Sequence, residues 1–269
     1  MRLDKNSTPI VKLIGLIVIL IASFVVTSIL GGIYYFFTED KVLLLTFFTV
    51  ICFGLSIFIY QKIFDKVLID KSLFALPKFW WLLIAILMFF LSIPIMESVS
   101  DSKPDRFMLG FCQNVNSLQI VGLVFAVAVF PAVFEEWFFR GIMQKNLVKL
   151  VHNDYIALVL TAVIFSLVHF DMSNFVARFI IGLLLGLLFY YSKSLIAGIL
   201  VHFINNLLAL LSYLLSSEEE LFHPEKIFDN SIYVILSVII FVVFILLSER
   251  YRRKTFSAQE NKELEDNDF

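Results

Sequence analysis

Apolar stretches long enough to cross a bilayer dominate the chain. A membrane-spanning helix needs about 20 predominantly apolar residues. The stretches that fit this template are residues 10–37, 42–60, 79–98, 118–140, 155–170, 174–191, 194–215 and 231–248. Their apolar runs are continuous rather than alternating, which favours helices over strands. Because 60% of the residues are hydrophobic and only 16% are charged, an ordinary soluble domain is excluded. We predict an all-α, polytopic membrane protein with about eight transmembrane helices and an intramembrane polar cavity.

The basic residues indicate an orientation in the membrane. With the N-terminus in the cytoplasm, 16 of the 21 Lys and Arg residues fall in cytoplasmic segments and five fall on the other side. Cytoplasmic loops of membrane proteins carry such an excess of positive charge. We therefore predict a multi-pass protein of the cell membrane with both termini in the cytoplasm. The lack of organelle signals favours a bacterial host.

The pattern divides the chain into four parts. Residues 1–117 hold three N-terminal spans, 118–215 a core of four spans, 216–248 an outer connection and the last span, and 249–269 a charged cytoplasmic tail that is predicted to be disordered. The net charge of −2 gives no indication of a nucleic-acid partner, so the expected partners are the lipid bilayer and a substrate. The sequence does not indicate an oligomeric state.

Three charged side chains stand together near the end of the fourth apolar run. Insertion scales put one charged residue at the centre of a span at about +2.5 to +3.5 kcal/mol, so Glu135, Glu136 and Arg140 are predicted to serve a function. Residues four apart on a helix share a face, which allows Glu136 and Arg140 to pair. Glu135 is turned about 100° away. One division has Glu136 neutralised by Arg140 while Glu135 faces a polar cavity, and the spacing also permits the reverse.

Two of the four histidines also lie in apolar runs. His169 closes the fifth run, four residues after Phe165, and His202 shares a helix face with Asn206 in the seventh. Each feature has a structural explanation when taken singly. These explanations are an interfacial charge cluster, a histidine bonded to a backbone carbonyl, and polar contacts between helices. All three features occur in the second half of the chain, whereas the first three spans carry almost no ionisable groups, and this grouping favours a functional site.

These groups suit hydrolysis of a carbonyl compound by water. A carboxylate can act as general base on a water molecule, and histidine and asparagine can donate hydrogen bonds to an oxyanion. A metal centre is a rival organisation, with zinc as the possible cofactor and Glu135, His169 and His202 as candidate ligands, although the H-E-x-x-H motif is absent. A serine nucleophile is weakly supported, because Ser166 belongs to no recognisable nucleophile elbow.

The polar residues form three ordered motifs, which are Glu135-Glu136-x-x-x-Arg140, Phe165-x-x-x-His169 and His202-x-x-x-Asn206. In this order, on separate predicted spans, they resemble the CPBP (CaaX protease and bacteriocin-processing, or Abi) family of intramembrane proteases, which includes type II CaaX prenyl endopeptidases. The resemblance covers roughly residues 118–210. It implies an eight-helix membrane fold with a cavity open toward the cytoplasm. Members of the family have been described both as metalloproteases and as metal-independent glutamate proteases.

The resemblance also implies a role for each residue of the motifs: Glu135 activates the water, His169 positions it, His202 and Asn206 form the oxyanion site, and Glu136 with Arg140 shapes and neutralises the pocket. The leading hypothesis is an intramembrane endopeptidase that cleaves a membrane-associated peptide or protein near the cytoplasmic side. The alternative is a non-catalytic immunity or scaffold protein that binds a peptide or a membrane partner.

The depth of the three motifs is a difficulty for this hypothesis. Counting along the predicted spans puts Glu135 and His202 in the inner half of the membrane. The same count puts His169 about 20 Å from the inner start of its span, toward the outer half.

Overall fold

The computed structural model describes residues 8–38, 40–65, 70–100, 106–112, 115–216 and 231–267. Every regular element in these ranges is a helix, which confirms the prediction of an all-α membrane protein. Most of the predicted outer connection, residues 217–230, lies outside the described residues, as do the first seven residues.

The first half of the described chain builds two long helices, a third that is interrupted by wider turns, and two short ones. Their bounds are α1 (Pro9–Thr38), α2 (Lys41–Thr46), η1 (Phe47–Ile51), α3 (Cys52–Tyr60), η2 (Gln61–Asp65), η3 (Lys71–Phe74), α4 (Phe79–Val99) and α5 (Arg106–Cys112). The segment from α2 to η2 is one continuous helix in which η1 and η2 are π-helical. It begins where the Asp40 side chain accepts a hydrogen bond from the backbone N–H of Leu43, at 3.0 Å.

The second half begins with one continuous helix from 117 to 151 and continues with four more. The bounds are α6 (Ser117–Leu123), η4 (Val124–Val129), α7 (Phe130–Glu136), η5 (Trp137–Gln144), α8 (Lys145–Val151), α9 (Asp154–Leu167), α10 (Phe175–Ser192), α11 (Leu195–Leu215) and α13 (Ser231–Asn267). A capping box between Asn116 and Gln119 starts α6. The left-handed residue His152, with φ of 52°, ends α8.

Seven helices in the described residues are long and apolar enough to cross a membrane, rather than the eight predicted. The predicted span that does not qualify is α9, which has 14 residues. At 1.5 Å per residue it is about 21 Å long, which is shorter than the roughly 30 Å hydrocarbon layer. The apolar run that continues to residue 170 is misleading, because Val168 and His169 turn the chain and Phe170 has a left-handed φ of 53°. The prediction of a full span at 155–170 is wrong.

The length of the 117–151 helix removes the difficulty with depth. Because this helix continues to Val151 rather than ending near 140, Glu135 lies 16 residues, or about 24 Å, from its end. His169 lies 15 residues after the start of α9 at Asp154, or about 22 Å along the chain at the helical rise. Both residues therefore stand at a similar height above the turn between α8 and α9.

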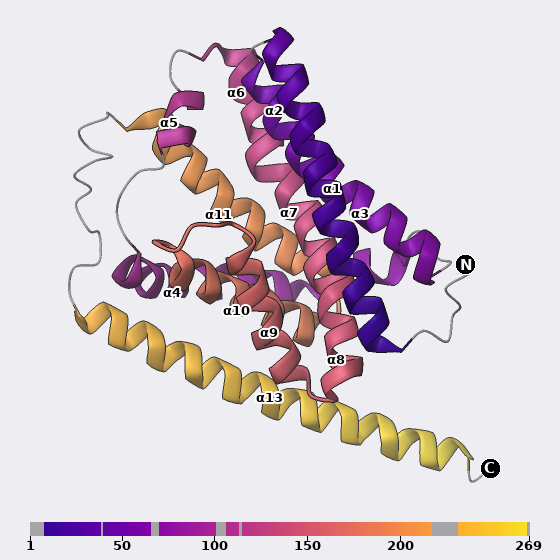
Figure 1. Ribbon diagram of the computed structural model, residues 1–269. Helices are drawn as coiled ribbons and strands as arrows, with labels where there is room; N and C mark the ends of the chain where they lie inside the picture. The colour runs from indigo at the N-terminus through magenta and orange to yellow at the C-terminus, as the bar shows by residue number, and fades with distance from the viewer. Residues whose placement is uncertain are drawn as a thin grey trace.

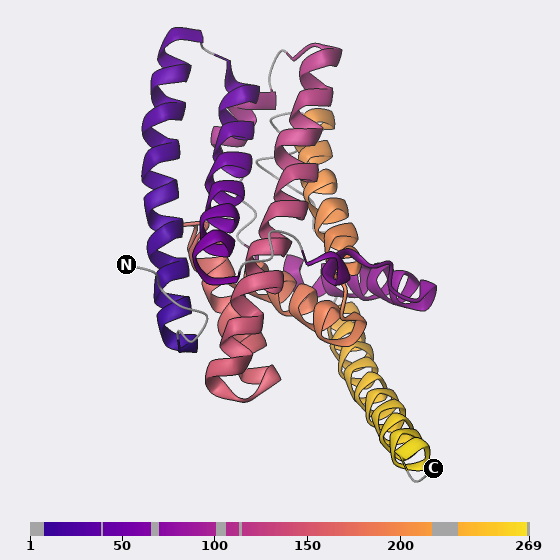
Figure 2. The ribbon, with the colours of Figure 1, turned by 90° about the vertical axis from the view of Figure 1, so that its right-hand side faces the viewer.

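Figure 2 shows α1, the α2–α3 helix, the α6–α8 helix and α11 side by side, with α4 running crosswise beside α11. In Figure 1, α10 lies among α4, α9 and α11, and it packs against all three. Glycines allow α10 to approach closely. A Cβ atom on Gly182 would lie 3.2 Å from the Cβ of Ala162, and one on Gly186 would lie 2.8 Å from Cγ of Leu158.

The last helix departs from the predicted division of the chain. Residues 231–251 form its apolar part and count among the seven candidate spans. Its backbone continues as a helix to Asn267, so the structure includes in α13 most of the tail for which disorder was predicted. Figure 1 shows α13 along one edge of the molecule, next to α4.

Candidate active site

The charged stretch of the fourth long helix lies deep inside the protein. Glu135 and Glu136 end α7, and Arg140 stands in η5, a π-helical segment of the kind that often occurs at functional sites. The exposed fractions are 8% for Glu135, 1% for Glu136 and 0% for Arg140. This burial rules out the explanation of an interfacial cluster whose charges reach water at the end of a span.

Arg140 is paired on several sides. Its Nη1 donates to Oε1 of Glu136 at 2.7 Å, and its Nη2 donates to the carbonyl oxygen of Gly182 at 3.0 Å. The guanidinium carbon lies 4.7 Å from the ring centre of Phe165, within cation–π range. One turn further along, Gln144 donates to the carbonyl oxygen of Gly186 at 3.3 Å. The close approach of α10 therefore supplies two backbone acceptors to the buried polar side of η5.

Glu136 also binds His202. The Nδ1 of His202 lies 3.0 Å from Oε1 of Glu136, and because a carboxylate oxygen only accepts, the hydrogen is on Nδ1. This bond turns Nε2 toward Glu135, whose Oε2 is 3.9 Å away. The Glu136 carboxylate thus joins Arg140 on its own helix to His202 on α11. The helical spacing allowed either glutamate to face the cavity. In the structure, Glu136 is the one that pairs with Arg140.

Glu135 faces a polar cavity of about 420 Å³. The cavity is also lined by His169 from the α9–α10 connection and by Asn205 and Asn206 from α11. The Oε2 atom of Glu135 is buried and has no hydrogen-bond partner among the described residues. A buried acceptor without a partner is costly. Because the atom itself is covered in this conformation, a small shift of the carboxylate is needed before a water molecule in the cavity can reach it.

His169 and Asn206 present defined atoms to this cavity. The Nδ1 of His169 donates to the carbonyl oxygen of Phe165 at 2.8 Å, so in the neutral ring Nε2 is the acceptor. Nδ2 of Asn206 donates to the carbonyl oxygen of Val127 at 3.2 Å, while its Oδ1 accepts from Asn205. Nδ2 carries a second hydrogen that this bond does not use. A hydrogen bond to a backbone carbonyl therefore accounts for Nδ1 of His169 but not for Nε2.

Sequence reasoning missed a second charged group in the cavity wall, formed by Asp171, Asn174 and Arg178. Nη1 of Arg178 lies 2.7 Å from Oδ2 of Asp171, and the Asn174 amide donates to the same oxygen at 3.0 Å. Although burial acts in the opposite direction, the hydrogen bonds from Asn174 and Arg178 hold the pKa of the Asp171 carboxyl below its usual value. The signal in the sequence is a short polar connection followed by an arginine inside the next apolar run.

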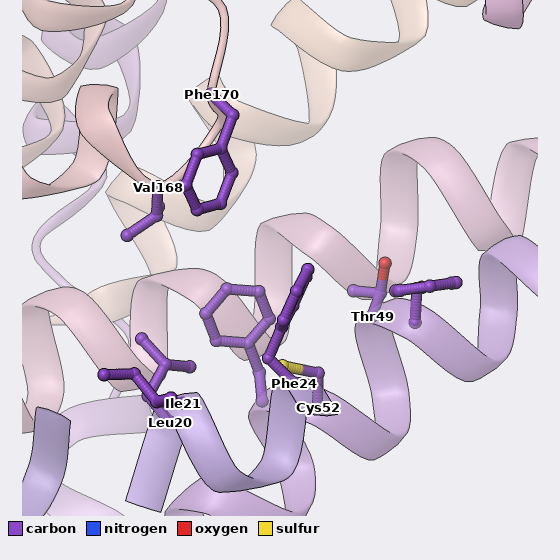
Figure 3. A pocket seen from close by; sticks show the side chains of 9 residues that line it. Leu20, Ile21, Phe24, Thr49, Cys52, Val168 and Phe170 are labelled. Carbon is purple, nitrogen blue, oxygen red and sulfur yellow. The ribbon is translucent and has the colours of Figure 1, made fainter. Parts of the chain in front are cut away.

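An apolar cavity of about 320 Å³ adjoins the polar one (Figure 3). Thr49 lines both cavities. Figure 3 shows Val168 and Phe170, the neighbours of His169, on the side of the cavity opposite Phe24 and Cys52. A ligand with an apolar part can therefore place that part next to the polar groups of the site.

The placement of the candidate residues bears on the two alternative chemistries. No group of three or more His, Cys, Asp or Glu side chains in the described ranges is arranged to hold a metal ion, so the candidate set of Glu135, His169 and His202 does not form a metal site as placed. Ser166 is 1% exposed, and its hydroxyl donates to the carbonyl oxygen of Phe175 at 2.6 Å. It is therefore not presented to the cavity as a nucleophile.

Comparison with protein families gives a match to part of the chain. Residues 117–208 match a family model described as type II CAAX prenyl endopeptidase Rce1-like. The resemblance to the CPBP family is confirmed. The matched segment begins at the first residue of α6, ends within α11, and includes all three motifs. Comparison with curated proteins and with solved structures gives no match. The matched segment is the part of the fold that carries the buried ion pair and most of the cavity wall.

Gly198 on α11 leaves little room beside the Glu136 carboxylate. A Cβ atom there would lie 3.0 Å from Oε2 of Glu136. Arg140 and His202 hold the same carboxylate in place through its other oxygen, Oε1. We expect Gly198→Ala to displace the carboxylate and to lower the free energy of unfolding by about 1–3 kcal/mol, measured by denaturant titration in detergent. Gly32→Ala is the control, because nothing lies within 4 Å of its Cβ position. Equal stabilities of the two variants would contradict this packing argument.

Proposed function

We propose that the chain is an intramembrane endopeptidase in which Glu135 activates a water molecule to hydrolyse a peptide bond. The observation that carries the proposal is that Glu135 lines a polar cavity together with His169 and Asn206, while its buried Oε2 has no hydrogen-bond partner among the described residues. A carboxylate in this position can accept a proton from water. The match to a family of CAAX prenyl endopeptidases supports the same class of reaction.

In this reaction a single carboxylate, that of Glu135, carries the proton from the water molecule to the leaving amine. A water molecule between Glu135 and Nε2 of His169 gives one proton to Glu135, and its oxygen attacks the carbonyl carbon of the substrate. The resulting oxyanion takes a hydrogen bond from the free N–H of the Asn206 amide. The carbon–nitrogen bond then breaks, and the proton on Glu135 passes to the leaving amine. Because the described donors do not form a metal site, no step is assigned to a metal.

Glu136 and Arg140 support this chemistry from behind the cavity. Glu136 fixes the ring of His202 through Nδ1, so Nε2 stays directed at Glu135. The Arg140 guanidinium compensates the Glu136 charge in a site from which water is excluded. When His202 carries a second proton at Nε2, it joins Asn206 as a donor to the oxyanion. In this assignment Glu136 and Arg140 are positioning residues.

The two adjoining cavities favour a peptide with an apolar part as the substrate. The polar cavity takes the scissile peptide bond, and the apolar cavity of Figure 3 takes a neighbouring apolar side chain or an attached lipid. We propose a membrane-associated peptide or a segment of a membrane protein.

The test is cleavage by the full-length protein in proteoliposomes prepared in ¹⁸O-labelled water. Peptides with and without an attached isoprenoid form the substrate panel. We expect cleavage with one ¹⁸O atom in the new carboxyl group and none in the protein after a single turnover. Label on a protein carboxyl would overturn direct attack by water. If the whole panel stays intact while the protein binds its peptides, the non-catalytic alternative is favoured.

A further inference from the structure

We propose that the polar cavity opens toward the side of the membrane opposite the N-terminus, so that its substrate comes from the non-cytoplasmic side. The location of the opening is independent of the proposed function, and only the statement about a substrate rests on it. Three features support this orientation: the direction in which the cavity extends, the packing below it, and the charge at the two ends of the bundle.

The cavity extends from Glu135 toward one end of the bundle. Its lining includes Leu45, Met108 and Tyr213. Leu45 lies four residues after the start of α2 and Tyr213 two residues before the end of α11, so both are within about 6 Å of a helix end along the axis. Figure 1 shows these ends near the end of α1, the start of α6 and the short helix α5. The cavity therefore reaches to within about one helical turn of this end.

Toward the other end of the bundle, packed side chains close the cavity below Glu135. Phe138 and Phe139 are 0% exposed and Met143 is 1% exposed. Below them, Asn146 donates to the hydroxyl of Tyr60 at 2.8 Å, and Tyr60 is also 0% exposed. A solvent path from Glu135 toward the α8–α9 turn would have to displace these fully buried side chains, which is costly in a close-packed interior.

The charge of the connections assigns the two ends to the two sides of the membrane. The closed end holds the start of α1, η3, the α8–α9 turn and the α10–α11 turn. Lysines are concentrated there, at positions 12, 62, 71, 78, 145, 149 and 193. The cavity end is poor in basic residues, more so because Arg178 belongs to the cavity wall rather than to an outer loop. The positive-inside rule therefore puts the closed end in the cytoplasm.

This orientation differs from the cytoplasmic opening that the family resemblance implies. The described residues contain seven candidate spans, and α9 is too short to be an eighth. In this orientation the α9–α10 hairpin enters the membrane from the cytoplasmic side, and the polar turn between its helices lines the cavity. The substrate class that fits is an exported peptide, or a segment of a membrane protein exposed on the outer face.

Thiol labelling of full-length protein in spheroplasts of a bacterial expression host tests the proposal. Cys52 and Cys112, both buried, are replaced by Ala, and one cysteine is introduced at a time. Ala209→Cys reports on the cavity, which this residue lines. Lys149→Cys reports on the exposed surface of the closed end. A membrane-impermeant maleimide is added before and after permeabilisation, and the labelled fraction is measured by mass shift.

We expect Ala209→Cys to be labelled in intact spheroplasts and Lys149→Cys only after permeabilisation. Labelling of Ala209→Cys only after permeabilisation, or not at all, would overturn the proposal. So would labelling of Lys149→Cys in intact spheroplasts. Because labelling requires no hydrolysis, a failed cleavage assay leaves this result interpretable, and the same experiment in a Glu135→Gln background should give the same pattern.

Discussion

Replacing Glu135 by Gln is expected to lower the rate of peptide-bond hydrolysis by about 10²–10⁴-fold, the usual contribution of a general base. The amide keeps the size of the side chain but cannot take a proton from water. The loss should appear in kcat rather than in KM, because the cavity keeps its shape. The measurement is the initial rate of cleavage in proteoliposomes that contain equal amounts of folded protein.

Stability separates a catalytic role from a structural role for Glu135. Its Oε2 has no hydrogen-bond partner in the described part of the chain, so removal of the charge should leave the melting temperature unchanged or raised. Glu97→Gln on α4 is the matched control, because Glu97 is absent from the cavity lining, and it should retain full activity. Full activity in Glu135→Gln would refute the proposed mechanism, and a large loss in Glu97→Gln would show that the assay reports general damage.

Replacing Arg140 by Met is expected to lower the free energy of unfolding by about 3–5 kcal/mol, because it leaves Glu136 charged and buried without its cation. Arg140 is 0% exposed and Glu136 is 1% exposed, so water cannot compensate. The hydrogen bond to Gly182 on α10 is lost as well. Unfolding in a detergent titration, followed by helix content, measures the change.

Two further variants assign the cause of this destabilisation. Arg178→Met removes the same type of side chain from an ion pair whose partners are 29% and 34% exposed, so it should cost only about 0.2–1 kcal/mol. Adding Glu136→Gln to Arg140→Met removes the uncompensated charge and should restore part of the stability. If Arg178→Met costs as much as Arg140→Met, or if the double variant is no better than the single one, burial of the pair is not the cause.

The sequence predicted the pairing of residues within one helix better than the arrangement of the helices around the site. Spacing alone indicated that Glu136 and Arg140 can pair and that His202 and Asn206 share a face, because helical periodicity is local. It could not choose between Glu135 and Glu136 as the cavity residue. That choice depends on which helix stands opposite each face, and here Gly182 of α10 and His202 of α11 meet Arg140 and Glu136.

The error at α9 has a similar origin. Hydropathy continues through Val168 and Phe170, so a span was predicted to residue 170. The chain turns there because Asp171 bonds Arg178 and Asn174, while Phe170 packs near Phe24 of α1, with ring centres 6.3 Å apart. These contacts join residues in the turn to one another and to a distant helix. A hydropathy pattern contains no information about them.

The sequence by itself determined that the chain is a helical membrane protein and that three polar motifs stand in its second half. Length, hydropathy and spacing are sufficient for this, because the bilayer imposes the same requirements on every apolar helix. Only the tertiary structure decided that Glu135 faces the cavity, that Arg178 belongs to its wall, and in which direction the cavity extends. These features depend on how closely neighbouring helices approach one another. Glycines at 182, 186 and 198 leave room for side chains of the facing helices, which a Cβ atom at those positions would crowd.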